Sequence, residues 1–285
     1  MAMNLFDKIA KQMDKNAKIA LASRIGGKDF KANKIDKKLN ENIKYFVDNS
    51  HPVIRVHKDA YDKINIDGKF KNAFEKGNLN TWNADALQKS RKPTENYIFG
   101  KLKDSERPIY GTMEPNNLNK TELDKIDIYN IDNMFNEDYG NIKFYPKKDN
   151  VVNRSTFTEG DSEFNEVLPF ALNTNNLGVL DNVENHFGKY KQYEKMEGEI
   201  DDLFSNLKRG AVGNQRYFET QIFGGLPLSD IGRVDIPAYY VEKPKNKKDV
   251  ISKQQAIDYA NQYGYQLNLT NDWGTILECL ANCPE

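Results

Sequence analysis

The chain has 285 residues, with 41 Lys and Arg against 42 Asp and Glu, and a formal net charge of −1. Aromatic residues make up 11% of it, and aromatic side chains in a nearly neutral chain indicate a folded protein rather than a disordered one. No run of 18 apolar residues occurs, which predicts no transmembrane helix, and the near-zero charge makes nucleic acid an unlikely partner.

Residues 1–50 are predicted to form a helical, basic N-terminal arm. Apolar residues repeat at helical spacing over 3–22, and a weaker helical pattern follows over 28–49. The arm holds 11 basic and 6 acidic side chains, which indicates either a solvated surface or an arm that docks on an acidic surface. It lacks a continuous apolar segment, so we expect no cleavable signal peptide. The predicted location is therefore the cytoplasm, or the outside by a signal-independent route, as for an effector or a phage-associated protein.

Residues 51–241 are predicted to form the main domain, of the α+β class. Short apolar and β-branched runs alternate with clusters of Gly, Pro, Asn and Asp, as expected for mainly antiparallel strands. Helical patterns among them are few, at Ala84–Gln88 and Tyr190–Leu207. The predicted strands are Val53–Val56, Pro108–Met113, Ile142–Tyr145, Ser155–Thr158, Tyr217–Phe223 and Ala238–Val241.

Residues 242–285 are predicted to form a linker and a small α-helical C-terminal appendage. Ser252 begins a helix by capping, and Gly264 ends it. A short strand over 265–269 and a last helix carrying Trp273, Ile276, Leu277 and Leu280 are expected next. Two cysteines, Cys279 and Cys283, are too few for a disulfide framework, and no histidine has metal-ligand spacing with them, so no metal site is predicted.

Three segments of the main domain combine residues that suit a ligand with phosphates and a ribose. Arg107 begins an apolar strand, and a guanidinium binds phosphate through two parallel hydrogen bonds. Residues 153–162 are rich in hydroxyl groups. Glu219 and Gln221 are two residues apart on a strand, so both side chains lie on one face of it. A carboxylate there can stabilise the positive charge that develops when a glycosidic bond breaks.

These segments resemble the Arg, Ser-Thr-Ser and Glu-x-Glu series of the ADP-ribosyltransferase superfamily. The resemblance is closest to the ADP-ribosyltransferase-like domains of phage minor head proteins and related bacterial toxin or effector proteins, and it covers about residues 60–235. The motifs that carry it are Phe70–Gly77, Phe99-Gly100, Arg107–Gly111, Tyr139-Gly140, Arg154–Ser162 and Tyr217–Ile231, in that order.

The resemblance implies an ADP-ribosyltransferase-like core of two packed, mainly antiparallel sheets with flanking helices, and NAD as a substrate held between the sheets. Arg107 would contact the NAD phosphates. Ser155 and Thr156 would support the pocket for the nicotinamide ribose, and Tyr110 and Asp161 would also bind NAD.

The resemblance further implies that Glu219 and Gln221 are the catalytic pair, with Gln221 in the position where the superfamily has its catalytic acid. Either Glu219 supplies the carboxylate, or another acid such as Asp161 does, or the domain binds NAD without cleaving it. The implied activity is mono-ADP-ribosyl transfer to a protein or other macromolecular acceptor. The alternatives are an inactive interaction or phage structural module and an NAD glycohydrolase, and the oligomeric state stays open.

Overall fold

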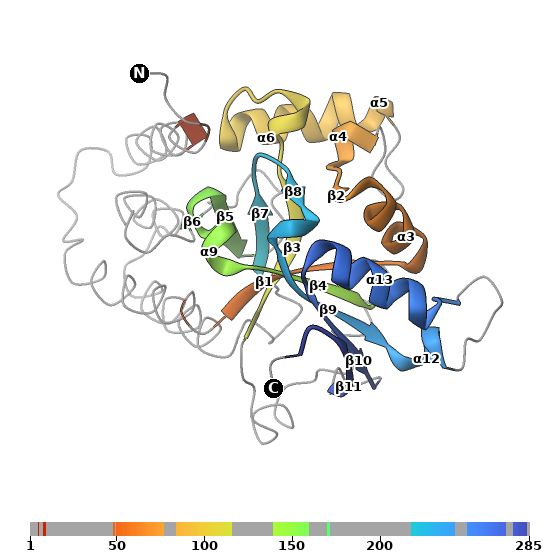
Figure 1. The fold of residues 1–285 in the computed structure, drawn as a ribbon. Coiled ribbons are helices and arrows are strands. Elements are labelled where there is room, and N and C mark those ends of the chain that lie inside the picture. The colour runs from red at the N-terminus through yellow and green to blue at the C-terminus, as the bar shows by residue number, and fades with distance from the viewer. Residues whose placement is uncertain are drawn as a thin grey trace, which may run out of the picture.

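The computed structural model combines helices with one large mixed sheet, which confirms the α+β class. Among the described residues, no helix is long and apolar enough to cross a membrane. The fold is drawn in Figure 1. The residues that the structure describes are 5, 8–9, 48, 50–76, 84–115, 139–159, 170–171, 218–242, 250–271 and 276–283.

The large sheet has nine strands in the order β11-β10-β9-β4-β1-β3-β7-β5-β6, and a small second sheet pairs β2 with β8. All neighbouring pairs in the large sheet are antiparallel except β9 with β10. The strands are β1 (Ser50–Val56), β2 (Lys69–Phe70), β3 (Ile109–Pro115), β4 (Ile142–Pro146), β5 (Ser155–Glu159), β6 (Phe170–Ala171), β7 (Phe218–Ile222), β8 (Leu226–Pro227), β9 (Ile231–Pro237), β10 (Gln266–Thr270) and β11 (Ile276–Ala281).

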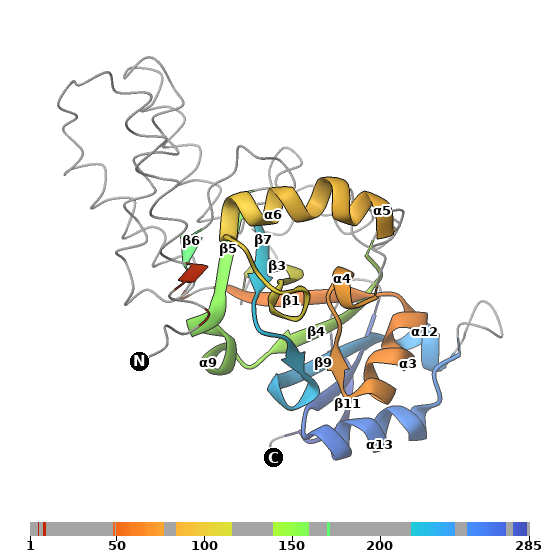
Figure 2. The same ribbon diagram turned by 90° about the horizontal axis from the view of Figure 1, so that it is seen from above.

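The helices flank this sheet. The α-helices are α3 (Lys58–Asp67), α4 (Ala73–Lys76), α5 (Ala84–Ala86), α6 (Lys92–Phe99), α9 (Lys148–Val151), α12 (Ala238–Val241) and α13 (Lys253–Tyr263). Single turns of other helix types lie at Leu87–Arg91, Asp104–Glu106, Val152–Arg154 and Leu228–Asp230. In Figure 2, α5 and α6 run along one side of the fold, whereas α3 and α13 lie together at the other end.

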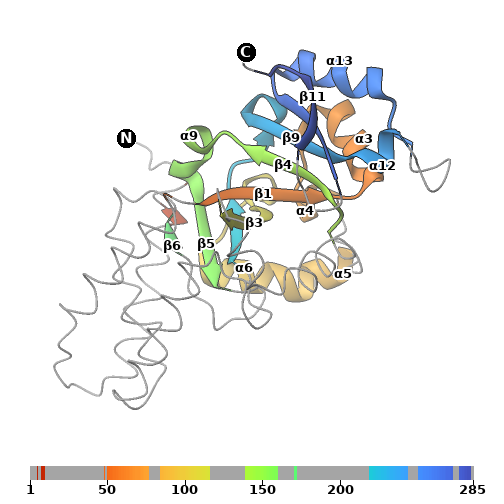
Figure 3. The same cartoon turned by 90° about the horizontal axis from the view of Figure 1, so that it is seen from below.

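Strand β1 joins two halves of the large sheet. Its first residues pair with β3 as far as Val53, opposite Thr112, and its last residues pair with β4 from Ile54, opposite Phe144. Seen from below, β5 and β7 run across the direction of β1 (Figure 3). The resemblance implied two packed sheets. Because β1 changes partner midway, they are instead two halves of one hydrogen-bonded sheet.

The main core lies between one face of the sheet and helices α3 and α13. Phe144, Val234, Ile236 and Leu267 are completely buried there. Alternation along each strand puts these apolar side chains on one face and polar ones on the other. Burying the apolar side chains of this core supplies the main favourable free energy of folding.

The C-terminal segment is part of the main sheet, so the predicted boundary of an appendage at residue 242 is wrong. Strand β10 pairs with β9 along Gln266–Thr270, and β11 extends the sheet. The predicted last helix is strand β11, because its backbone groups pair with β10. The capping predictions are confirmed: the Ser252 hydroxyl accepts a hydrogen bond from the Gln255 N–H, and Gly264 has a φ of 73°.

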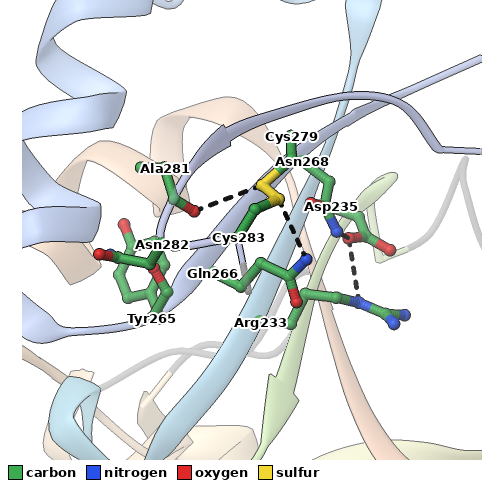
Figure 4. Close-up of a disulfide and its surroundings, with 9 residues drawn as sticks. All are labelled: Arg233, Asp235, Tyr265, Gln266, Asn268, Cys279, Ala281, Asn282 and Cys283. Atoms are coloured by element: carbon green, nitrogen blue, oxygen red, sulfur yellow. Dashed lines mark hydrogen bonds and ion pairs between the residues drawn. A yellow bond between two sulfur atoms is a disulfide. The ribbon is translucent and has the colours of Figure 1, made fainter. Parts of the chain in front are cut away.

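A disulfide between Cys279 and Cys283 closes a short loop at the end of β11 (Figure 4). Within the loop, Asn282 has a φ of 58°, and its amide nitrogen donates to the carbonyl oxygens of Ala260 and Tyr265 at 3.1 and 2.9 Å. The disulfide closes the loop on itself, and Asn282 within it fastens the end of β11 to the end of α13.

Two further predictions of local structure are corrected. Ala238–Val241, predicted as a strand, is the helical turn α12, in which the Glu242 N–H donates to the Ala238 carbonyl at 2.8 Å. Strand β9 just before it was not predicted. The proposed helix Tyr190–Leu207 lies outside the described residues.

Of the predicted N-terminal arm, the structure describes Leu5, Lys8, Ile9, Asp48 and Ser50. Ile9 is completely buried in an apolar cluster with Phe99 and Phe223, against which Leu5 also packs. This contact with the main domain is apolar, whereas the basic charge of the arm indicated a solvated surface or docking on an acidic surface.

Candidate functional site

A cavity of about 190 Å³ opens where the two halves of the sheet separate. Beyond Val53, β1 turns to β4, while residues Ile109–Gly111 of β3 pair with β7 on their other side. From this point β1 and β3 diverge, and residues of both strands line the cavity. The change of partner by β1 therefore creates the site.

Two glycines allow the walls of this cavity to approach. A Cβ atom on Gly111 would collide with the carbonyl oxygen of Val53, at the point where β1 and β3 are still paired. A Cβ atom on Gly140 would collide with the backbone of Val56, and Gly140 has a φ of 90°. The close approach of Gly140 places the preceding Tyr139 in the cavity wall, with 42% of its surface exposed.

Glu219 is the carboxylate of the cavity. It lies on β7 opposite Thr112 of β3, and only 6% of its surface is exposed. Its Oε1 atom accepts a hydrogen bond of 2.7 Å from the amide nitrogen of Gln221. The Gln221 carbonyl oxygen in turn accepts from the Thr156 hydroxyl at 2.7 Å. This fixed chain orients the Glu219 carboxylate from the buried side.

Tyr110 stands beside Glu219 in the cavity wall. Its hydroxyl donates to Oε1 of Glu95 on α6 at 2.7 Å, and the guanidinium of Arg91 lies 4.2 Å from its ring centre. Burial raises the pKa of the Tyr110 phenol well above its usual range, and the carboxylates of Glu95 and Glu219 act in the same direction. Tyr110 is therefore a neutral group with its proton directed to Glu95.

Arg107 does not reach the cavity, contrary to the role that the resemblance implied. Its side chain is completely buried. One terminal nitrogen donates to Glu95 at 2.8 Å, the other to Asn96 at 2.8 Å, and Nε donates to Asp104 at 3.3 Å. The ring of Phe74 lies 4.5 Å from the guanidinium carbon. Arg107 therefore holds α6 against the start of β3 and is not placed to contact a phosphate.

The remaining predicted residues have mixed outcomes. Thr156 is fully buried and belongs to the chain that orients Glu219. The hydroxyl of Ser155 donates to the backbone carbonyl of Val151 at 2.8 Å, and Ser155 does not line the cavity. Side chains along β5 alternate between the two faces of the sheet. Thr156 is opposite Gln221, so Ser155 lies on the other face. Asp161 lies outside the described residues.

Sequence reasoning missed Glu95, which joins Tyr110 and Arg107 through its two oxygens. It lies in a helix that begins at α5 and continues through a π-helical turn, Leu87–Arg91, into α6. Pro93 has no backbone N–H to donate to the preceding turn, which accounts for the irregular winding there. The helix predicted at Ala84–Gln88 is confirmed, but the prediction ended before Glu95.

Asn72 and Arg154 belong to motifs of the resemblance, which implied no role for them. Both have clear structural roles. The Asn72 side chain accepts from the N–H groups of Phe74 and Glu75 and donates to the carbonyls of Asp104 and Arg107. It thereby fixes α4 to the segment before β3.

Arg154 performs a similar task at the end of β7. Its guanidinium donates to the carbonyls of Phe223 and Gly225 and to the carboxylate of Asp230. These contacts hold the turn that follows Gln221. Motif residues that suggest ligand binding in the sequence therefore support the backbone around the cavity.

The charged residues that line the cavity are Arg55, Lys71, Lys76 and Glu219. Three cations against one carboxylate favour a ligand that carries negative charge. Tyr110 and Tyr139 add aromatic surface, and Asn72 adds an amide. Such a lining suits a molecule that combines a planar ring with phosphates.

No protein-family model matches this sequence, and a search of curated proteins finds no relative.

Proposed function

We propose that the chain is an NAD-dependent mono-ADP-ribosyltransferase that transfers ADP-ribose to a macromolecular acceptor. The observation that carries the proposal is the Glu219 carboxylate, which lines the cavity beside Tyr110 and is fixed in orientation by Gln221. Cleavage of the bond between nicotinamide and ribose develops positive charge on the ribose. A preorganised carboxylate in a largely buried site stabilises such charge far better than it does in water.

The proposal assigns the carboxylate role to Glu219 and a positioning role to Gln221. Gln221 is completely buried, and its amide bridges Glu219 and Thr156. A carboxylate at residue 221 would lie within hydrogen-bond distance of Glu219, where two buried negative charges repel each other. A neutral amide avoids that repulsion and donates a hydrogen bond to the Glu219 carboxylate. The absence of an acid at residue 221 is therefore compatible with catalysis.

In the proposed reaction, the C–N bond to nicotinamide breaks and nicotinamide leaves with the bonding electrons. Glu219 faces the resulting positive centre on the ribose. A nucleophilic atom of the acceptor then forms a bond to the same carbon and gives up its proton. Tyr110, held neutral by its burial, contributes an aromatic wall and does not act as a base at neutral pH.

The test is incubation of the purified chain with NAD labelled in the adenylate part and a cell lysate. Glu219→Gln keeps the shape of the side chain and removes its charge, so we expect labelling to fall by at least about a hundredfold. The matched control is Glu278→Gln on β11, whose carboxylate is half exposed and pairs with Lys253; it should label like the wild type. Equal labelling by both variants would contradict the assignment of Glu219.

The same reaction separates transfer from hydrolysis. Nicotinamide release without labelling of any macromolecule indicates that water is the acceptor, and the chain is then an NAD glycohydrolase. Glu219→Gln should abolish nicotinamide release in either case, because both reactions pass through the same break of the glycosidic bond.

A second candidate is an ADP-ribosyltransferase-like module that has no activity and serves in interactions. The specific observation in its favour is Arg107, which the resemblance places on the NAD phosphates and which is fully enclosed by Glu95, Asn96 and Asp104. Thermal unfolding with and without NAD decides: a ligand at 100 times its Kd stabilises by about 2.7 kcal/mol. No shift of Tm at millimolar NAD supports the inactive module.

A further inference from the structure

We infer that Lys71 and Lys76 form an anion subsite in the wall of the cavity, and that this subsite binds the diphosphate of a nucleotide ligand. The inference rests on the proposed function in taking NAD as that ligand. It gives the charged part of the ligand a place that Arg107 does not provide.

The segment that carries the two lysines is held rigidly. Asn72, 3% exposed, lies between them and makes hydrogen bonds to α4 through Oδ1 and to Asp104 and Arg107 through Nδ2, the latter at 2.7 and 3.2 Å. Lys71 precedes this anchor, Lys76 ends the helical turn that follows it, and both line the cavity that contains Glu219. A fixed backbone reduces the entropy that is lost when the lysines engage a ligand.

The three cations of the cavity differ in how they are neutralised. Arg55 is bound to Glu114 through two nitrogens, at 3.0 and 2.8 Å, and its side chain is only 6% exposed. Lys71 forms an ion pair of 2.7 Å with Asp67. In the described part of the chain, no ion-pair partner lies within 4.0 Å of Lys76. Lys76 is therefore the cation of the cavity with the most to gain from a bound anion.

The surroundings of Lys76 are rich in positive charge. Although Lys76 is exposed, desolvation by the protein around it lowers its pKa, as do the ammonium groups of Lys63 on α3 and of Lys71, whereas the neighbouring Glu75 acts in the opposite direction. Glu75 is itself engaged by Lys69 at 3.5 Å and by the backbone N–H of Asn72. Lysines gathered at a cavity repel each other until an anion binds between them, and a diphosphate carries the charge to do so.

The test measures binding by calorimetry at fixed ionic strength, with inorganic pyrophosphate, ADP-ribose and adenosine as probes. Lys76→Gln should weaken pyrophosphate and ADP-ribose binding by about tenfold, and Lys71→Gln by less, because Asp67 already neutralises part of its charge. Lys89→Gln is the matched control, since Lys89 is 75% exposed and pairs with Asp85 outside the cavity. Adenosine, which has no phosphate, should bind all variants alike.

The outcomes distinguish the subsite from the proposed function. If Lys76→Gln binds ADP-ribose and pyrophosphate as tightly as Lys89→Gln does, or if neither probe binds the wild type at millimolar concentration, the subsite is wrong, whatever the activity. If the probes bind through Lys76 while NAD is never cleaved, the subsite stands and the enzyme proposal fails. If NAD is cleaved with an unchanged KM by Lys76→Gln, the enzyme stands and the subsite fails.

Discussion

The two halves of the large sheet differ in what they bury. The half formed by β4, β9 and β10 packs apolar side chains such as Phe144 and Ile236 against α3 and α13. The half formed by β3, β7 and β5 encloses polar ones, among them Gln221 and Thr156, which are equally inaccessible. Burying a polar group costs free energy unless it is fully hydrogen-bonded. The first half therefore supplies most of the apolar core, and the second, beside core residues such as Ile222, holds the polar groups around Glu219 in fixed positions.

The largest expected effect is in the apolar half. Phe144→Ala removes a fully buried ring that packs edge-on against Phe70, with ring centres 5.0 Å apart. We expect a loss of about 4 kcal/mol in the free energy of unfolding, measured by urea denaturation. Ile66→Ala, at a side chain that is 72% exposed, is the control and should change stability by less than about 0.5 kcal/mol. Similar losses for both variants would mean that this half is not the stabilising core.

The next effect is in the polar half. Arg107→Leu leaves Glu95 buried with less of its charge neutralised, so we expect a loss of about 3 kcal/mol of stability. Adding Glu95→Gln should recover part of that loss, since it removes the buried carboxylate whose charge is no longer fully neutralised. The measurement is again urea denaturation, now combined with NAD binding. A variant of normal stability that no longer binds NAD would return Arg107 to the role that the sequence suggested.

The third effect is at the seam between the halves. Glu114 of β3 pairs with Arg55 of β1 and Lys143 of β4, at 2.8 and 3.3 Å. Burial raises the pKa of Glu114, but the two cations outweigh burial and hold it at about 2, below its ordinary value of 4.5. Because the pKa of Glu114 is lower in the folded state than in the unfolded state, its ion pairs stabilise the protein above pH 4.5. This contribution disappears as the pH falls toward 2.

Glu114→Gln should accordingly lower stability by about 2 kcal/mol at pH 7 and make the unfolding free energy less dependent on pH between 4.5 and 2. Unfolding free energies measured at several pH values in that interval test the expectation. Glu278→Gln, in the exposed ion pair with Lys253, should leave the pH dependence nearly unchanged. If the unfolding free energy falls equally with decreasing pH in wild type and Glu114→Gln, the seam does not depend on this carboxylate.

The sequence predicted the strands of the polar half well and parts of the apolar half poorly. Alternation placed Glu219 and Gln221 on one face of β7, and the hydrogen bond between their side chains confirms it. Residues 238–241 have the aromatic and β-branched character of a strand, yet they form the turn α12. A four-residue stretch is too short for propensity to outweigh tertiary context.

The spacing of Ile276, Leu277 and Leu280 fits a helix as well as a strand. Pairing with β10 decides for the strand β11, and that partner is not evident from the local pattern.

The role of Arg107 was not predictable for a related reason. A lone arginine at the start of a strand gives no indication of what faces it. Its partner Glu95 is twelve residues earlier, on a helix whose apolar residues are not periodic. The cavity itself arises from the exchange of partners within β1 at Val53 and Ile54, and local sequence patterns do not encode pairing between distant strands. Side-chain chemistry and the resemblance were enough to select candidate residues from the sequence. The contacts that these residues make became known only from the fold.

The position of β7 between β3 and β5 has a consequence for the order of folding. Within the described sheet, β5 reaches β3 only through β7, although β7 begins at Phe218, far along the chain from both. Contacts between segments so distant in sequence form slowly, because closing the intervening chain costs entropy before the contacts form. The pairs of β1 with β3 and β4 can therefore form while the chain from Thr156 through Gln221 to Glu219 is still missing. The apolar core also needs β9, α13 and β10, which follow β7, so we expect the core and the candidate active site to be completed together, late in folding.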